Sequence, residues 1–135
     1  MTVPFERKGL DLGEYHHCLD VENLTQSMDF YLKLNFRIIG DHREDNWAVL
    51  QHNNMVLCLF QGHIDNNLLN FRGGDIESIY REGVDAGRTF SKQAHIEHDG
   101  SWSAEIIDPD GNLIYFNTFP DERDKYVKEG SLIER

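Results

Sequence analysis

The chain has 135 residues, 39% of them apolar and 27% charged, which is enough for one globular domain with its own core. Its net charge is −11, with 24 acidic residues against 13 basic ones and no Lys/Arg cluster, so we expect neither a nucleic acid nor a membrane surface as a partner. No apolar run reaches the roughly 18 residues of a membrane helix, and no signal peptide is evident. The two cysteines do not suggest a disulfide framework, so we expect a cytoplasmic protein.

The first half of the chain is predicted to form a strand, a helix and three further strands. Residues 1–13 are expected to be a loose lead-in, and residues 15–21 a short strand. Asn23 suits the N-cap of a helix that Asn35 ends, with an apolar stripe at Leu24, Met28, Tyr31 and Leu34. Strands are predicted at residues 36–39, 47–51 and 55–60, and the turn at 52–54 joins the last two as a hairpin.

The second half repeats this order. A strand at residues 68–71 is followed by a helix that Asp75 caps and Gly87 ends. Residues 89–98 are predicted to be extended, and residues 101–107 lead into a hairpin over 105–116. The distances from Val21 to Phe36 and from Gly74 to Thr89 are both 15 residues, which indicates a duplicated βαβββ unit.

We therefore predict one α+β domain over residues 14–119, built from two βαβββ modules with mostly antiparallel sheets curled around a concave cavity. The first module covers about residues 14–63 and the second about residues 66–119. The charged tail over 120–135 is expected to be a frayed helix or arm.

The turn Asp108-Pro-Asp-Gly111 has the residues of a type I turn followed by a left-handed glycine, which is typical of a β-hairpin. Together with the duplicated module, with His16 to Val21 and with Ser27 to Tyr31 on the first helix, it makes the chain resemble the vicinal oxygen chelate superfamily. This group contains glyoxalases, bleomycin resistance proteins and extradiol dioxygenases. The resemblance covers roughly residues 14–119 and implies a homodimer.

Enzymes of that superfamily bind a divalent metal through residues on the first and fourth strands of each module. The resemblance places these four positions at His16, Cys58, near Leu69, and at Tyr115. Only His16 is a usual ligand, because leucine cannot bind a metal and tyrosine is a poor ligand for zinc, nickel, manganese or iron(II). We therefore expect no cofactor and no family metal; if a divalent metal binds, His16 and Cys58 are its expected ligands.

Alternation along the strands predicts which side chains face the cavity. The ligand-binding residues expected from this pattern are His16, Trp47, Cys58, Phe60, Phe71, Tyr115 and Asn117. Such a lining suits a flat or apolar small molecule held by a few hydrogen bonds, although the same aromatic residues could simply fill a core. Glu105 alternates with Ile106 and is expected to point inward.

Several other side chains could carry chemistry. His16 and His17 are adjacent on a strand and so point to opposite faces, which prevents joint chelation. His16, Cys18 and Cys58 could bind a soft metal, but ordinary buried thiols explain the cysteines more simply. His95 and Glu97 share a strand face and could form a general base, or could simply be solvated.

Three functions are consistent with the sequence. The first is a metal-free protein that binds a small, apolar or aromatic organic ligand, as in the antibiotic-sequestering branch of the superfamily. The second is a metal-dependent lyase, isomerase or dioxygenase with an atypical site around His16. The third is a metal-free enzyme that uses Glu105, His16 or Tyr115 as an acid or base. The absence of the usual metal ligands at the family positions other than His16 favours the first function, the metal-free binding protein.

Overall fold

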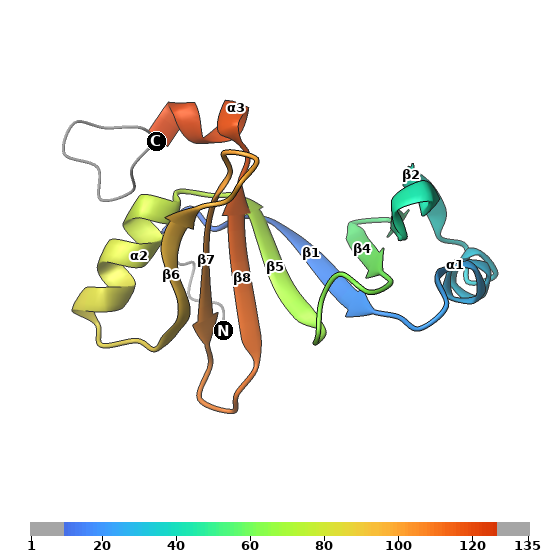
Figure 1. The fold of residues 1–135 in the computed structure, drawn as a ribbon, viewed down its shortest axis with the longest axis horizontal. Helices are drawn as coiled ribbons and strands as arrows, with labels where there is room; N and C mark the ends of the chain where they lie inside the picture. The colour runs from blue at the N-terminus through green and yellow to red at the C-terminus, as the bar shows by residue number, and fades with distance from the viewer. Residues whose placement is uncertain (1–9, 127–135) are drawn as a thin grey trace, which may run out of the picture.

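The computed structural model describes residues 10–126, in which the two modules join into one eight-stranded sheet (Figure 1). The strand order is β2-β3-β4-β1-β5-β8-β7-β6. The strands are β1 (Gly13–Asp20), β2 (Arg37–His42), β3 (Trp47–His52), β4 (Met55–Phe60), β5 (Leu68–Gly73), β6 (Phe90–Ile96), β7 (Trp102–Ile107) and β8 (Leu113–Thr118). The predicted lead-in over residues 1–9 and the tail over 127–135 lie outside the described residues.

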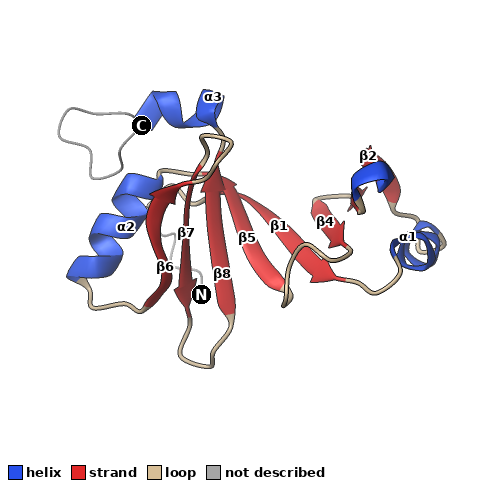
Figure 2. Cartoon of the chain, viewed as in Figure 1, coloured by secondary structure: helices blue, strands red, loops and turns tan. Residues whose placement is uncertain are grey.

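The antiparallel pairing of β1 with β5 joins the modules, and each module has one parallel pair, β1 with β4 and β5 with β8. The remaining pairs are antiparallel, and the sheet does not close into a barrel. The structure confirms the α+β class and the duplicated βαβββ order (Figure 2).

Two helices cover one face of the sheet, one in each module (Figure 1). Helix α1 (Leu24–Leu32) begins at Asn23, whose side chain accepts a hydrogen bond from the Gln26 amide, as predicted. Helix α2 (Ile76–Asp85) begins at Asp75, whose carboxylate accepts from the Ser78 amide. Asn35 and Gly87 adopt positive φ beyond the helices and reverse the chain there.

Short helical segments complete the fold. Arg43–Asp45 is a 3₁₀ turn between β2 and β3, while α3 (Pro120–Arg123) and a 3₁₀ turn at Asp124–Tyr126 follow β8. The predicted C-terminal arm is thus helical as far as the structure describes it. Within residues 10–126 no helix is long and apolar enough to cross a membrane.

The predicted turn between β7 and β8 is confirmed. The Gly111 amide donates to the Asp108 carbonyl at 3.0 Å, and Gly111 has φ +88°. One Asp108 carboxylate oxygen accepts from the amides of Asp110 and Asn112, at 2.9 and 2.8 Å. Asp108 is therefore occupied in holding the turn.

The core has one cluster under each helix. Leu24 and Met28 of α1 pack on Ala48, Leu50, Leu57 and Leu59. Ile76 and Ile79 of α2 pack on Trp102, Ala104 and Phe116. The odd-numbered side chains Tyr15, His17 and Leu19 of β1 lie on this helix-covered face, so the even-numbered ones point to the opposite side, which we call the helix-free face.

The side chains of β5 point to the opposite sides of the sheet from those that the sequence predicts. Phe71 of β5, expected in the ligand cavity, packs under α2 with its ring 5.9 Å from that of Phe116. Leu69, expected at the third family position, shares that orientation, and its register partner is His17. The β5 side chains on the helix-free face are those whose register partners are the even-numbered residues of β1. They are Leu68, Asn70 and Arg72, which pair with Cys18, His16 and Glu14.

Gly83 offers a test of the packing between α2 and β6. A Cβ atom at this position would lie 2.5 Å from Cζ of Phe90, so alanine cannot enter without displacing the ring. We expect Gly83→Ala to lower the free energy of unfolding by about 1–3 kcal/mol, although alanine favours a helix by about 1 kcal/mol over glycine. Chemical denaturation measures the change.

The matched control is Glu82→Ala, at an exposed position of the same helix, which should change stability by no more than about 0.5 kcal/mol. A stabilised Gly83→Ala variant would show that helix propensity outweighs this contact.

Candidate functional site

The helix-free face is organised in rows that follow the pairing register. The first row holds Trp47, Phe60 and Asp20, and the second holds Val49, Cys58, Cys18 and Leu68. The third holds His16, Asn70, Tyr115 and Glu105, and the fourth holds Glu14, Arg72, Asn117, Ser103 and His95. Successive rows lie about 7 Å apart, two residues along a strand. The face therefore changes from apolar in its second row to polar in its third and fourth.

A thiol–imidazole cluster lies where the second and third rows meet. The His16 Nδ1 atom lies 3.9 Å from the Cys58 sulfur, and its Nε2 atom lies 3.6 Å from a Glu14 carboxylate oxygen. The His16 side chain is 12% exposed, whereas that of Glu14 is 74% exposed. Cys18 is buried beside Cys58 on the neighbouring strand. The imidazole is thus held between a buried sulfur and a solvated carboxylate.

The two thiols have opposite tendencies to ionise. A hydrogen bond from Cys18, followed by one from His16, lowers the pKa of Cys58 to about 5 against the effect of burial. The hydrogen bond with Cys58, together with burial, raises the pKa of Cys18. The contact with Cys58 also raises the pKa of His16. Of the two thiols, Cys58 is therefore the one that favours the thiolate form, because it faces the imidazole and the charge of Arg72 favours the anion further.

Asn70 connects this cluster to the second module. Its amide nitrogen donates to the Tyr115 carbonyl at 3.1 Å and to the Asn117 side-chain oxygen at 2.8 Å, while its own oxygen lies 3.8 Å from the Cys18 sulfur. It is 8% exposed, so these partners replace water. Strand alternation does not identify Asn70 from the sequence, because it predicts that Leu69 and Phe71 of β5, rather than Asn70, face the ligand.

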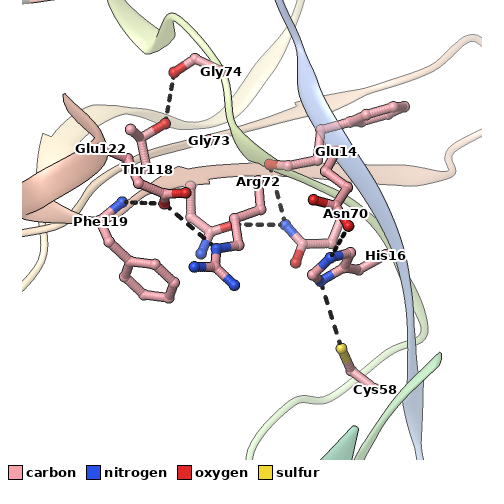
Figure 3. A network of polar contacts seen from close by, with 12 residues as sticks. Glu14, His16, Cys58, Asn70, Arg72, Gly73, Gly74, Thr118, Phe119 and Glu122 are labelled. Carbon is pink, nitrogen blue, oxygen red and sulfur yellow. Dashed lines mark hydrogen bonds and ion pairs between the residues drawn. The ribbon is translucent and has the colours of Figure 1, made fainter. Parts of the chain in front are cut away.

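Arg72 joins the face to the C-terminal helix. Its Nε atom lies 3.4 Å from a Glu122 carboxylate oxygen, and its guanidinium lies 4.5 Å from the centre of the Phe119 ring. Glu122 also accepts from the Phe119 amide at 3.2 Å (Figure 3). The beginning of α3 is thereby fixed against β5, and both charges of the ion pair are satisfied locally.

A carboxylate cluster occupies the second module. Glu97 accepts from the Ser103 hydroxyl at 2.7 Å, contacts His95 Nε2 at 2.8 Å, and accepts from the Tyr115 hydroxyl at 3.4 Å. The hydrogen bond from Ser103, and then the contacts with His95 and Tyr115, lower the pKa of Glu97 although burial opposes them. Burial raises the pKa of Tyr115, so its phenol stays protonated and donates. Sequence alternation paired His95 with Glu97 but gave no signal for Ser103.

Glu105 points to the helix-free face, as expected, but it lies deep in the sheet. It is 5% exposed, and its carboxylate accepts from the Ser91 hydroxyl at 2.8 Å. Because Glu105 is almost fully buried, a bound molecule would reach its carboxylate less easily than that of Glu97, whose side chain is 36% exposed.

The expected ligand-binding residues divide into three groups. His16, Cys58, Tyr115 and Asn117 lie together around Asn70. Trp47 and Phe60 stack at 5.7 Å in the first row, at the far end of the face, where His42 stacks on Trp47 at 3.9 Å. Phe71 lies in the core and is removed from the set.

The donor set does not fit the divalent metal that enzymes of this fold hold at the corresponding positions. With the facing of β5 corrected, these positions are His16, Cys58, Asn70 and Tyr115, and none of them supplies a carboxylate. The Asn70 side-chain oxygen, the atom that could bind a metal, accepts from the Cys18 thiol at 3.8 Å, and the Tyr115 hydroxyl donates toward Glu97 rather than toward His16. Within residues 10–126 no group of three or more His, Cys, Asp or Glu side chains is placed to hold a metal ion.

Two cavities lie outside the thiol–imidazole and carboxylate clusters. One of about 1110 Å³ lies on the helix-covered side between α2 and the strands, with Leu12, Ile79 and Phe116 in its wall. Another of about 480 Å³ is bordered by His17, Leu69 and Asn112. The larger one lacks convergent buried polar groups, since the Asp108 carboxylate in its wall holds the β7–β8 turn. We therefore place the candidate site on the helix-free face, where the ionisable groups converge.

Comparison with known proteins gives a fold but no close relative. No protein-family model matches the sequence, and the comparison with curated proteins finds no match. Among solved structures, a glyoxalase/bleomycin resistance protein/dioxygenase superfamily member from Vibrio splendidus 12B01 is 15% identical, with a TM-score of 0.65; the match covers 82% of this chain and 99% of that one.

Two further structures show the same architecture. The NAD-dependent benzaldehyde dehydrogenase of Legionella pneumophila is 16% identical, with a TM-score of 0.66 over 78% of this chain and 98% of that one. The Mn(II)-bound glyoxalase of Novosphingobium aromaticivorans is 15% identical, with a TM-score of 0.57 over 82% of this chain and 40% of that one. At sequence identities this low, the similarity to these structures shows the fold alone. The chain has the vicinal oxygen chelate fold, which is the fold of glyoxalase/bleomycin resistance protein/dioxygenase superfamily members.

Proposed function

We propose that the protein binds a small, largely apolar or aromatic organic molecule carrying a positive charge on its helix-free face, without a resident metal. The observation that carries the proposal is the part-exposed Glu97 carboxylate, whose pKa is lowered by contacts with Ser103, His95 and Tyr115. The Tyr115 ring lies in the third row, next to the apolar second row. A cationic group at Glu97 would gain a charge-assisted hydrogen bond. The body of the molecule would lie over the Tyr115 ring toward Leu68.

The charge of the chain supports a cationic ligand. The net charge is −11, and Glu14 and Glu122 add carboxylates near the fourth row, where Arg72 is already paired. An anionic ligand would meet this excess, whereas a cation would be attracted to it. The rows are spaced so that a molecule about 14 Å long reaches from the fourth row to the second along a strand.

Metal content tests the first part of this proposal. The donor set lacks a carboxylate and its Asn70 amide is occupied, so we expect purified protein to contain only substoichiometric divalent metal by elemental analysis. Neither chelator treatment nor His16→Ala should change that content. A stoichiometric metal that is lost in His16→Ala would overturn the metal-free proposal and favour the metal-dependent enzyme.

Ligand preference tests the second part. The probes are benzylammonium, which is cationic and carries N–H donors, benzyl alcohol, which is neutral, and benzoate, which is anionic. In NMR titrations we expect the cation to bind most tightly and to shift the amides of Glu97, Ser103 and Tyr115. Glu97→Gln should weaken its affinity about tenfold, the scale of one charge-assisted hydrogen bond. Glu14→Gln, at a mostly exposed carboxylate, is the matched control.

The pH dependence of this binding follows from the direction of the Glu97 shift. Because the pKa of Glu97 is lowered, the carboxylate remains charged at pH values where an ordinary glutamate is protonated. Affinity for the cation should therefore stay constant from neutral pH down to about 4.3, the usual glutamate pKa, and fall only below it. Equal affinity of the cationic and neutral probes at neutral pH would contradict the assignment of Glu97.

We also infer that two copies associate through the surface around α1. Phe30, Leu34 and Ile39 are 60%, 53% and 47% exposed there, and apolar side chains grouped in this way are typical of an interface. Light scattering should give the mass of a dimer for the native chain and of a monomer for Phe30→Asp. A monomeric native chain would remove this inference without affecting the ligand site.

A further inference from the structure

The two cysteines of the chain are direct neighbours across two strands. Cys18 of β1 and Cys58 of β4 are register partners in a parallel pair, and both thiols are free. Neighbouring strands lie about 4.8 Å apart, which falls within the Cα separation of about 4.4–6.8 Å that disulfides span. Register partners point to the same face of a sheet, so the two sulfurs can approach each other without a movement of the backbone.

The surroundings of the two thiols differ in a way that assigns them different roles. The Cys58 sulfur lies 3.9 Å from His16 Nδ1, so the imidazolium can stabilise a thiolate there and can release a proton to a group that leaves. The Cys18 sulfur lies 3.8 Å from the Asn70 side-chain oxygen, an acceptor that favours the protonated thiol. One thiol is thus prepared to attack and the other to remain protonated.

We propose that Cys58 and Cys18 form a peroxide-responsive dithiol, with Cys58 as the attacking thiolate and Cys18 as the resolving thiol. The Cys58 thiolate attacks one oxygen of hydrogen peroxide; an S–O bond forms, the O–O bond breaks, and the leaving hydroxide takes a proton from His16. Cys58 becomes a sulfenic acid, oxidised by two electrons, while the peroxide is reduced to water.

The second step closes the disulfide. The Cys18 sulfur attacks the Cys58 sulfur, an S–S bond forms, and the S–O bond breaks. The hydroxide that leaves combines with the Cys18 proton, so that one peroxide and two thiols give one disulfide and two waters. This dithiol is separate from the proposed ligand contact at Glu97, and it acts on a different molecule.

The burial of the cysteines restricts the oxidant to a small one. Cys18 and Cys58 are 4% and 5% exposed, and Ile64 and Phe60 pack against them. The His16 side chain, 12% exposed, borders Cys58 on the side of the third row. Hydrogen peroxide is of the size of a few water molecules, whereas a bulky aromatic disulfide cannot reach the sulfur without opening the fold.

The test uses the full chain, reduced and freed of reductant, with hydrogen peroxide as the oxidant and a chelator present. We expect mass spectrometry of the intact protein to show the loss of two hydrogens, and peptide mapping without reduction to show Cys18 joined to Cys58 within one chain. Dithionitrobenzoate, a bulky aromatic disulfide, should react far more slowly with the folded protein than with the denatured protein. Oxidation that stops at a sulfinic acid, or that links only different chains, would overturn the proposal.

Two cysteine variants test the roles, and serine is close enough in size to keep the fold, which circular dichroism verifies. In Cys18→Ser the sulfenic acid has no resolving thiol, so we expect mass spectrometry of the intact protein to show one added oxygen, and dimedone present during denaturation to label Cys58. In Cys58→Ser the remaining thiol should react with peroxide at least about tenfold more slowly than the native protein. A Cys58→Ser variant that reacts at the native rate would show that Cys18 attacks, which contradicts the assignment.

A histidine variant tests the proton donor. His16→Gln removes the imidazolium, and we expect the rate of disulfide formation to fall about tenfold. His52→Gln, at an exposed histidine at the end of β3, is the matched control and should keep the native rate. Equal rates in the two histidine variants would remove His16 from the mechanism.

Discussion

The antiparallel pairing of β1 with β5 is the constraint on which the rest of this structure depends. It joins two modules that would otherwise be separate four-stranded sheets, and its register sets His16 opposite Asn70. From that one pairing follows the third row, in which the thiol–imidazole cluster of the first module meets Tyr115 of the second. A slip of one residue would place Leu69 beside His16 and would bury Asn70 under the helices.

Asn70 shows how this pairing is kept in register. An amide buried at the junction must find partners for its nitrogen and oxygen, and it finds them at Asn117, at the Tyr115 carbonyl and at Cys18. A shifted register would leave these groups without partners at a cost of about 1–3 kcal/mol for each. A side chain in such a position specifies the arrangement of the sheet, and it leaves no amide free to serve as a metal ligand.

The sequence predicted the elements well because their signals are local. Caps at Asn23 and Asp75, the apolar stripes of the two helices and the Asp108–Gly111 turn each depend on residues close in the chain. The facing of β5 is not local. Its sequence Leu-Leu-Asn-Phe-Arg has an apolar residue available for either face, so alternation alone favoured Leu69 and Phe71 toward the ligand. The side chain that is buried is decided by tertiary packing: Phe71 lies under α2 and stacks on Phe116, which is 45 positions away in the chain.

The same limit applies to the site. Strand alternation correctly placed His16, Cys58 and Tyr115 on one face, but the partners that determine their chemistry come from other strands. The pKa of Glu97 is lowered because Ser103, His95 and Tyr115 contact its carboxylate, and the pKa of Cys58 is lowered because β1 sets Cys18 and His16 beside it. The strands bring His16, Cys58, Asn70 and Tyr115 onto one face, and under our proposals a thiolate and a phenol act there in separate clusters, because the fold alone does not determine the chemistry of these positions.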